Sequence, residues 1–265
     1  MLQPVVGILG ITILRSLTEA FNMILRLTLA VAFALTLHAQ TADELVRKNI
    51  LAHGGIEKIK AIKSIRMTGR FQSGSFIAQV GRDSLAPNLI RSTFTLQGMT
   101  EIDAYDGATG WRISPFEGRK DPELLGEDDL RQLVEDADFY GPLIDYQEKG
   151  NKVEYLGHDT VDGDDALKLK VTLKNGDVAY YFLDPETFLE IRVENIRYIR
   201  GAIREDFREP GSYKLSGGVY YPFSMSIGRK QRPGDTTKIT YDKVEVNVPL
   251  DKKLFQMPES PKGAR

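Results

Sequence analysis

Most of the chain alternates apolar and polar residues, which predicts β-strands. In residues 166–173, leucine and valine alternate with lysine and threonine, and this period of two is typical of a strand with one buried and one exposed face. Asn175-Gly176 then predicts a tight turn, because both residues tolerate positive φ. Similar segments recur in residues 64–114 and 152–248. The pattern therefore predicts about ten antiparallel strands joined mainly by hairpins.

Two segments have a helical period instead. Residues 42–62 predict two short amphipathic helices, separated by Gly54-Gly55, where glycine commonly ends a helix. Residues 121–145 predict a further helical region, with apolar residues at helical spacing on one face and acidic residues on the other. The acidic face has two interpretations. It is either the solvated side of a helix packed on the sheet, or part of a cover over a hollow.

A sheet of about ten strands curls rather than staying flat. If it curls around its apolar face, short helices can cover the hollow without filling it. We therefore expect an α+β, mainly β fold: a single large curved antiparallel sheet, forming an incomplete, unclosed β-barrel, with short helices covering the concave apolar face. Since no linker interrupts the pattern, residues 40–265 are expected to form one domain.

Apolar strand and helix positions supply the candidate binding residues. The residues expected to line the cavity are Met67, Phe94, Trp111, Leu169, Tyr180, Phe182, Ile191, Tyr221 and Phe223. The residues expected to form the lid are Leu45, Ile50, Ile59, Leu130, Leu133 and Val134. Concave apolar sites of this kind suit small hydrophobic ligands.

The N-terminus predicts export. An apolar run, residues 27–37, follows Arg26, and Ala39 precedes the predicted cleavage point; this is the pattern of a signal peptide spanning residues 1–39. Translation from Met23 would make residues 1–22 a mis-assigned upstream extension. The alternative is a longer anchor at the inner membrane. The chain contains no cysteine, which excludes disulfides, a thiolate nucleophile and a lipidated N-terminal cysteine.

Charge and motifs restrict the chemistry. A net charge of −2 gives no electrostatic basis for a nucleic-acid partner. The sequence lacks the common nucleophile, metalloprotease and nucleotide-binding motifs, so we expect no catalytic residues, no cofactor and no enzymatic activity. His53 and His158 are interpreted as structural. A hydrolase using acidic residues is a weaker hypothesis, because no acid–base pair can be named.

Two charged series have a structural and a functional interpretation. The acidic residues between Asp159 and Asp165 resemble a calcium loop, but they lack its ligand spacing and fit a hairpin turn, so no metal site is expected. A series of arginines is either a docking surface or the exposed side of long edge strands, and the second interpretation is favoured. These arginines are Arg192, Arg197, Arg200, Arg204 and Arg208.

Several segments, in order, carry a resemblance to a known family. They are Ala42-Asp43-Glu44, His53-Gly54-Gly55, the residues 60–69 (KAIKSIRMTG), the residues 105–112 (YDGATGWR), the residues 244–249 (VEVNVP) and Leu254-Phe255. Across residues 42–258 the chain resembles bacterial outer-membrane lipoprotein-sorting proteins of the LolA-like superfamily. The resemblance implies an incomplete β-barrel with helices over an apolar cavity, and a soluble carrier that shields acyl chains in the periplasm.

The resemblance also separates carrier from receptor. The outer-membrane receptor type is lipidated, whereas this chain has no cysteine and so resembles the soluble carrier type. Characterised carriers latch the lid with an arginine on the cavity wall, and this sequence assigns that role to no single position. Distant members bind other lipids or act as envelope-stress sensors.

The hypothesis from the sequence is therefore a periplasmic carrier. It would bind acyl chains of lipoproteins or lipids as a monomer and move them toward the outer membrane, with an inner-membrane exporter and an outer-membrane acceptor as partners. The alternative is an envelope sensor or regulatory module that uses the same fold to recognise a protein or lipid signal.

Overall fold

The computed structural model describes residues 41–199 and 201–259. All elements belong to the compact unit Ala42–Arg265. The predicted signal peptide, residues 1–39, lies outside the described residues, as does Arg200. Among the described residues, none of the helices is long and apolar enough to cross a membrane.

Strands dominate the described chain. In order they are β1 (Ser64–Ser73), β2 (Phe76–Leu85), β3 (Leu89–Leu96), β4 (Met99–Tyr105), β5 (Gly110–Ser114), β6 (Arg119–Leu124), β7 (Lys152–Val161), β8 (Asp164–Thr172), β9 (Val178–Leu183), β10 (Glu190–Ile199), β11 (Ala202–Ser216), β12 (Val219–Arg229) and β13 (Arg232–Val246). The helices are α2 (Ala42–Ala52), α3 (Ile56–Ala61), α4 (Glu127–Ala137) and the 3-10 turns η1 (Pro115–Glu117) and η2 (Lys252–Leu254).

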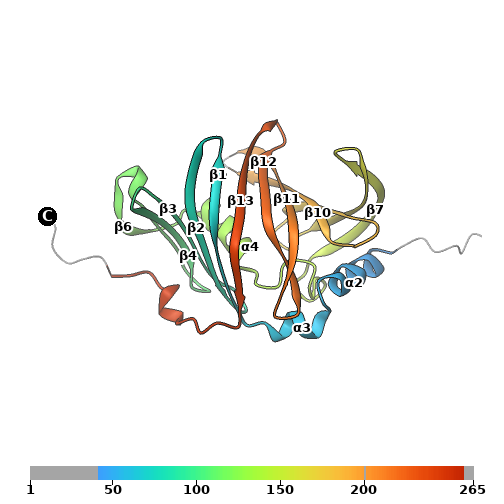
Figure 1. Ribbon diagram of the computed structural model, residues 1–265, viewed down its shortest axis with the longest axis horizontal. Coiled ribbons are helices and arrows are strands. Elements are labelled where there is room, and N and C mark those ends of the chain that lie inside the picture. Colours follow the sequence, from blue (N-terminus) through green and yellow to red (C-terminus); the bar gives the residue numbers. More distant parts are fainter. Residues whose placement is uncertain (1–40, 200, 260–265) are drawn as a thin grey trace, which may run out of the picture. The chain divides into compact units, whose positions relative to one another are not determined.

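The described strands form one 13-stranded antiparallel sheet. Its order is β6-β5-β4-β3-β2-β1-β13-β12-β11-β10-β9-β8-β7, so every neighbour is also a sequence neighbour except the central pair β1 and β13. The edges β6 and β7 do not pair, and the sheet curves around α4 (Figure 1). The predicted mainly β fold with an unclosed curved sheet and few short helices is confirmed.

The segment between the two edges differs from its prediction. Residues 121–145 were expected to be helical, but only Glu127–Ala137 form α4, and residues 121–124 belong to β6. Residues 138–150 follow as turns. The helical period holds where Leu133 and Ala137 are buried against the sheet. The Pro122 nitrogen cannot donate a hydrogen bond, and edge strands tolerate such residues.

The sheet has a helical face and an outer face, and we use these names throughout. On the helical face, α2 packs Leu45 and Val46 against Leu167 and Leu169. On the same face Ile62, next to α3, packs with Val219. α4 packs on β3 and β4. Three clusters of buried residues, one under each helical segment, therefore form the core of the described unit.

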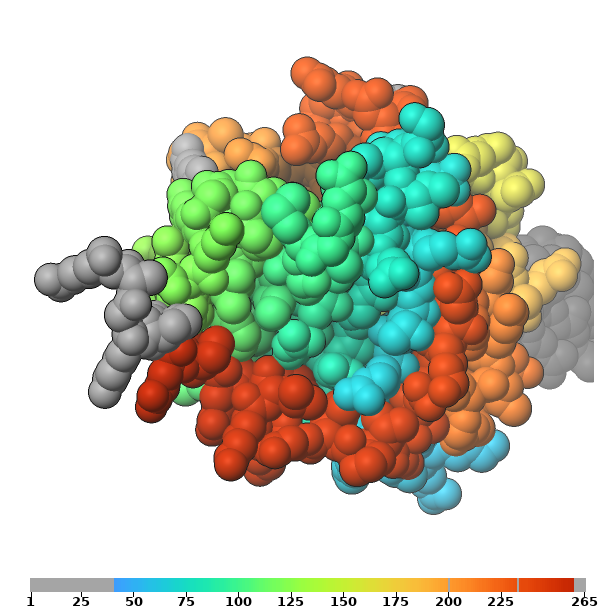
Figure 2. Space-filling model, turned by 60° about the vertical axis from the view of Figure 1, so that its left-hand side comes forward, coloured from blue at the N-terminus to red at the C-terminus, as the bar shows by residue number. Residues whose placement is uncertain are grey.

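The outer face has a cover of its own. Trp111 donates its indole N–H to the Phe255 carbonyl oxygen at 2.7 Å, and both residues are almost fully buried. Figure 2 shows the C-terminal segment, in red, lying against the green strands that include β5. The chain beyond β13 thus shields apolar side chains that lie on the outer face of the sheet.

Candidate ligand-binding pocket

A pocket opens on the helical face between α2, α3, residues 138–144 and the strands β9, β10 and β12. Its volume is about 300 Å³. The aliphatic part of its wall consists of Ile50, Ile59, Ile65, Leu143, Ile144 and Val219. Aromatic residues complete it, namely Phe139, Tyr140, Tyr181, Tyr220 and Tyr221. Apolar concave sites with a few polar groups are the usual form of small-molecule pockets, and this volume is at their lower limit.

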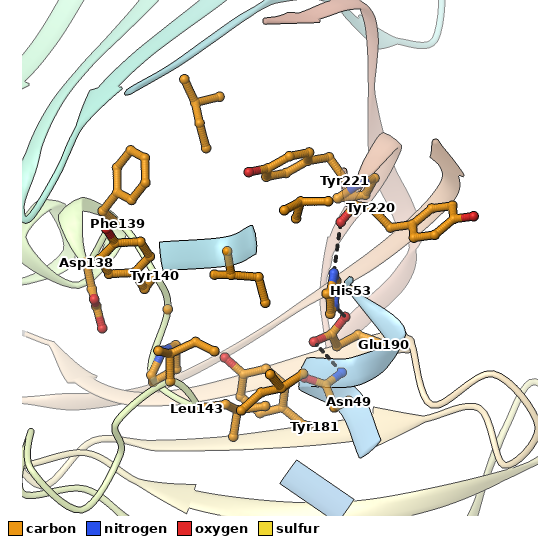
Figure 3. A pocket seen from close by; sticks show the side chains of 18 residues that line it. Asn49, His53, Asp138, Phe139, Tyr140, Leu143, Tyr181, Glu190, Tyr220 and Tyr221 are labelled. Atoms are coloured by element: carbon orange, nitrogen blue, oxygen red, sulfur yellow. Dashed lines mark hydrogen bonds and ion pairs between the residues drawn. The ribbon is translucent and has the colours of Figure 1, made fainter. Parts of the chain in front are cut away.

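Glu190 anchors the end of α2 at one side of the pocket. Its carboxylate accepts hydrogen bonds from His53 Nε2 at 2.8 Å, Tyr213 Oη at 3.0 Å and Asn49 Nδ2 at 3.0 Å. The other ring nitrogen of His53, Nδ1, lies 2.8 Å from the Tyr220 carbonyl oxygen. Figure 3 shows this hydrogen-bonded chain along the pocket wall. We call His53, Asn49, Glu190 and Tyr213 the Glu190 cluster.

Local backbone geometry brings His53 to this position. Gly54 follows it with φ +123°, and a Cβ there would lie 2.4 Å from the Gly218 carbonyl oxygen. Only glycine permits both the positive φ and this close approach between the end of α2 and the β11–β12 turn. The Tyr220 N–H also donates to the His53 carbonyl at 2.9 Å.

Burial and charge act in opposite directions on this pair. Burial disfavours the charged imidazole, but the Glu190 carboxylate and the hydrogen bonds to Glu190 and Tyr220 outweigh it and raise the pKa of His53. Burial likewise opposes ionisation of Glu190, but the His53 charge and the hydrogen bonds from His53 and Asn49 hold the pKa of Glu190 well below its ordinary value. The two groups therefore form an ion pair over a wide pH range.

α4 lies beside this pocket but does not line it. Arg197 of β10 donates to the Glu135 carboxylate at 2.9 Å, and Arg208 of β11 lies 3.6 Å from Asp136. From the other half of the sheet, Arg82 of β2 donates to the Asp136 carbonyl oxygen, and Arg112 of β5 lies 3.8 Å from Asp129. We call these four arginines the α4 clamp.

The α4 clamp corrects the interpretation of the arginine series. Arg197 is only 7% exposed, and β10 and β11 are interior strands, not edges. Arg197 also pairs with Asp206 at 2.9 Å, so its charge is neutralised on the helical face. In the same series Arg192 of β10 pairs with Glu209 of the neighbouring strand β11. Arg204 is exposed.

The predicted cavity residues occupy several different places. Tyr221 lines the pocket. Met67 and Phe223 are on the helical face beside it, packed on the cluster of Ile62 and Val219. Leu169 is fully buried beneath α2. Phe94 is also on the helical face, but it packs edge-to-face on Phe71 in a separate aromatic group with Phe76 and Phe116.

Tyr221 is the one predicted cavity residue among the pocket-lining residues that the structure describes, and the remaining predicted residues lie farther from the pocket or on the other face. Trp111 is on the outer face under Phe255. Tyr180 and Phe182 are also on the outer face, where Lys168 Nζ lies 5.0 Å from both rings. Ile191 lies at the irregularity between β10 and β9. The neighbouring residues Ala179, Tyr181 and Leu183 face the helices instead.

The predicted lid residues also divide into groups. Ile50 and Ile59 line the pocket. Leu45 is fully buried in the core under α2. Leu133 is buried and Leu130 half-buried against β3, β4 and β5, while Val134 is 41% exposed.

The sequence interpretation missed the polar part of the pocket. His53 was interpreted as structural, and its pairing with Glu190 over 137 residues is invisible in the sequence. Leu143, Ile144 and Tyr140 lie in a segment expected to be helical. Tyr181 was passed over for its neighbours, because residues 178–183 are all apolar or aromatic and alternation cannot choose a face.

The acidic series near Asp159 forms cross-strand pairs. Asp159 pairs with Lys168 at 2.7 Å, and Asp165 pairs with His158 at 2.9 Å. No cluster of three or more potential metal ligands occurs within residues 41–199 and 201–259.

Solved structures with this fold come from several bacteria. A LolA superfamily protein from Nitrosomonas europaea matches with a TM-score of 0.56 and 12% identity, over 82% of this chain and 98% of that one. A DUF1329 family protein from Desulfovibrio piger matches with a TM-score of 0.53 and 13% identity, over 80% and 95%. A Vibrio parahaemolyticus structure described as an outer membrane lipoprotein-sorting protein domain gives the same values.

Sequence comparison adds no relative to these structures. No family model matches the chain, and no curated protein matches it. The structural matches, at 12–13% identity, concern architecture. On the strength of its curved open sheet and its helices on the concave side, this chain has a LolA-like fold.

Proposed function

We propose that this protein is a non-enzymatic carrier that binds an acyl chain of a lipid or lipoprotein in the pocket between α2, α3 and residues 138–144. The single observation that supports it most is the apolar wall of a pocket left open between sheet and helices. Enclosing about ten methylene groups would contribute roughly 8 kcal/mol before the costs of binding. That attraction is non-directional, so it requires no catalytic constellation.

The proposed location of the carrier is the periplasm. The predicted signal peptide would place the carrier in the periplasm, where a ligand taken from one membrane protein could pass to another. The Vibrio parahaemolyticus structure supports this context, because that protein is described as an outer membrane lipoprotein-sorting protein domain. The inner-membrane exporter and outer-membrane acceptor remain proposed partners.

Two isoleucines on α3 give a matched test. Ile59 lines the pocket, whereas Ile56 is 38% exposed on the same helix and does not line it. An Ile59→Asp variant places a carboxylate at the wall and should weaken binding of the neutral dye N-phenyl-1-naphthylamine by about tenfold or more. Ile56→Asp should bind the dye like the wild type.

Native protein supplies the second measurement. Mass spectrometry of lipid extracted from protein purified from bacterial envelopes should find an acyl-chain compound with the wild type and less of it with Ile59→Asp. If no lipid is extracted and the dye binds neither protein, the carrier function is refuted. Equal dye affinity in both variants would place the ligand somewhere other than this pocket.

A further inference from the structure

Resting on the proposed function, we infer that the ligand is an uncharged single-chain amphiphile, whose polar group is hydrogen-bonded by the hydroxyls of Tyr181 and Tyr221. It would be an acyl ester or amide of the monoacylglycerol kind, rather than a fatty acid, a phospholipid or a triacylated anchor. Three features carry this inference: the size of the pocket, the pairing of its charges and two tyrosine hydroxyls that are available to a ligand.

The size of the pocket limits the number of chains. A volume of about 300 Å³ is at the lower limit for small-molecule pockets. Such a space suits one acyl chain better than three long ones. The fixed position of α4, held from β2, β5, β10 and β11 by the α4 clamp, prevents expansion toward the aromatic group around Phe94.

The charges in the pocket wall are already neutralised. Glu190 pairs with His53, and both of its oxygens accept hydrogen bonds within the Glu190 cluster. Asp138 pairs with Lys149 at 2.6 Å. Among the described residues, these three are the ionisable acid and histidine side chains of the pocket wall. A buried carboxylate or phosphate would find no unpaired cation there, and burying an unpaired charge is strongly unfavourable.

Two hydroxyls remain available. The hydrogen bonds of the described residues include none to Tyr181 Oη or Tyr221 Oη, whereas Tyr140 Oη and Tyr213 Oη have partners. Figure 3 shows the Tyr181 and Tyr221 hydroxyls pointing toward the space between the labelled side chains, and the Tyr220 hydroxyl pointing away. Burial raises the pKa of both Tyr181 and Tyr221, so both keep the proton that they can donate.

A hydroxyl that donates to a carbonyl or ether oxygen suits a neutral ligand. An ester or amide oxygen can accept from both tyrosines without bringing charge into the pocket. The chain would then lie along the aliphatic wall formed by Ile50, Ile65 and Leu143. Without such a partner the two hydroxyls would lose hydrogen bonds to water when a hydrocarbon fills the pocket, which costs affinity.

Displacement of N-phenyl-1-naphthylamine tests the inference. Monodecanoylglycerol should displace the dye at concentrations about tenfold or more below those of decanoate, because the anion has no cation to pair with. Monodecanoylglycerol should also displace the dye at lower concentrations than a tripalmitoylated lipopeptide does. Equal potency of decanoate would refute the uncharged ligand, and equal potency of the lipopeptide would refute the single chain, while both leave the carrier function standing. If the dye does not bind and no lipid is extracted from the native protein, the carrier function itself fails.

Adjacent tyrosines in β9 supply a matched control. The double variant Tyr181→Phe/Tyr221→Phe should lose about tenfold in affinity for monodecanoylglycerol and keep its affinity for the hydrocarbon-like dye. Tyr180→Phe, whose ring is on the outer face near Lys168, should change neither. Unchanged monodecanoylglycerol affinity in a folded double variant would refute the role of the two hydroxyls.

Discussion

α4 and α3 both lie on the helical face, yet they are held in very different ways. α4 buries Leu133 and Ala137 and is fixed by arginines from four strands. α3 has six residues and buries none of them, and its Lys60 forms a largely exposed ion pair with Asp145. The helix with the stronger attachments does not line the pocket, and the weaker one does. Stability and access to the pocket are therefore assigned to different covers.

Removing Arg197 is the most direct test of the difference between α4 and α3, because it weakens the attachment of α4. Arg197→Met leaves Glu135 and Asp206 without their buried partner, and the free energy of unfolding should fall by about 3 kcal/mol. Urea denaturation measures the loss. The exposed Arg204→Met should cost little, and dye affinity should survive in both folded variants. A large loss of dye affinity in Arg197→Met would mean that α4 shapes the pocket after all.

Hydrogen exchange would sharpen the comparison without a mutation. Backbone amides of α3 should exchange about 100-fold faster than those of α4, because local opening of α3 exposes no buried side chain of its own. Mass spectrometry of peptides from the two helices measures both rates in one sample. Equal protection would contradict the conclusion that α3 is held more weakly than α4.

A substitution at Trp111 tests whether the outer face contributes to ligand binding. Trp111→Phe removes the N–H that the buried Phe255 carbonyl accepts, so the free energy of unfolding should fall by about 1–2 kcal/mol. Dye affinity should stay at the wild-type value, since the ring is on the far side of the sheet from the pocket. Chemical denaturation and dye titration of the same preparation test both parts, and weakened dye binding would contradict the assignment.

The smallest effect concerns His53. Its pKa is raised above 6.5 in the folded protein, so its protonation favours folding. This contribution is complete below pH 6.5 and disappears as the pH rises through the raised pKa. His53→Gln should therefore lower the free energy of unfolding by more at about pH 6 than at about pH 9. An equal loss of unfolding free energy at the two pH values would show that the charge of His53 contributes nothing to stability.

The fold was predictable because hairpin turns and alternation are local signals. Asn175-Gly176 and the glycines between other strands define the meander, and an apolar stripe predicts one covered face. The pairing of β1 with β13 is different, because it joins residues as far apart in the chain as Met67 and Val244. No local signal specifies it.

The site was less predictable, because the assumption that the inner face is apolar fails around α4. Trp111 was expected to line the cavity, which would place its neighbour Arg112 on the opposite face. The acidic helix reverses this, because Asp129 supplies a partner for Arg112 on the helical face and Phe255 supplies a cover for Trp111 outside. In β9 every residue is apolar or aromatic, so only the packing of α2 selects Tyr181 over Tyr180.

The two edge strands follow each other in the chain, although they lie at opposite ends of the sheet order. The stretch between them, residues 125–151, is a covalent link across the opening, whereas the halves of the sheet meet by hydrogen bonds at β1 and β13. Residues 138–144 of this stretch also line the pocket. Insertions or deletions there would widen or narrow the pocket while leaving every strand intact, which gives evolution a simple means of fitting one scaffold to ligands of different girth.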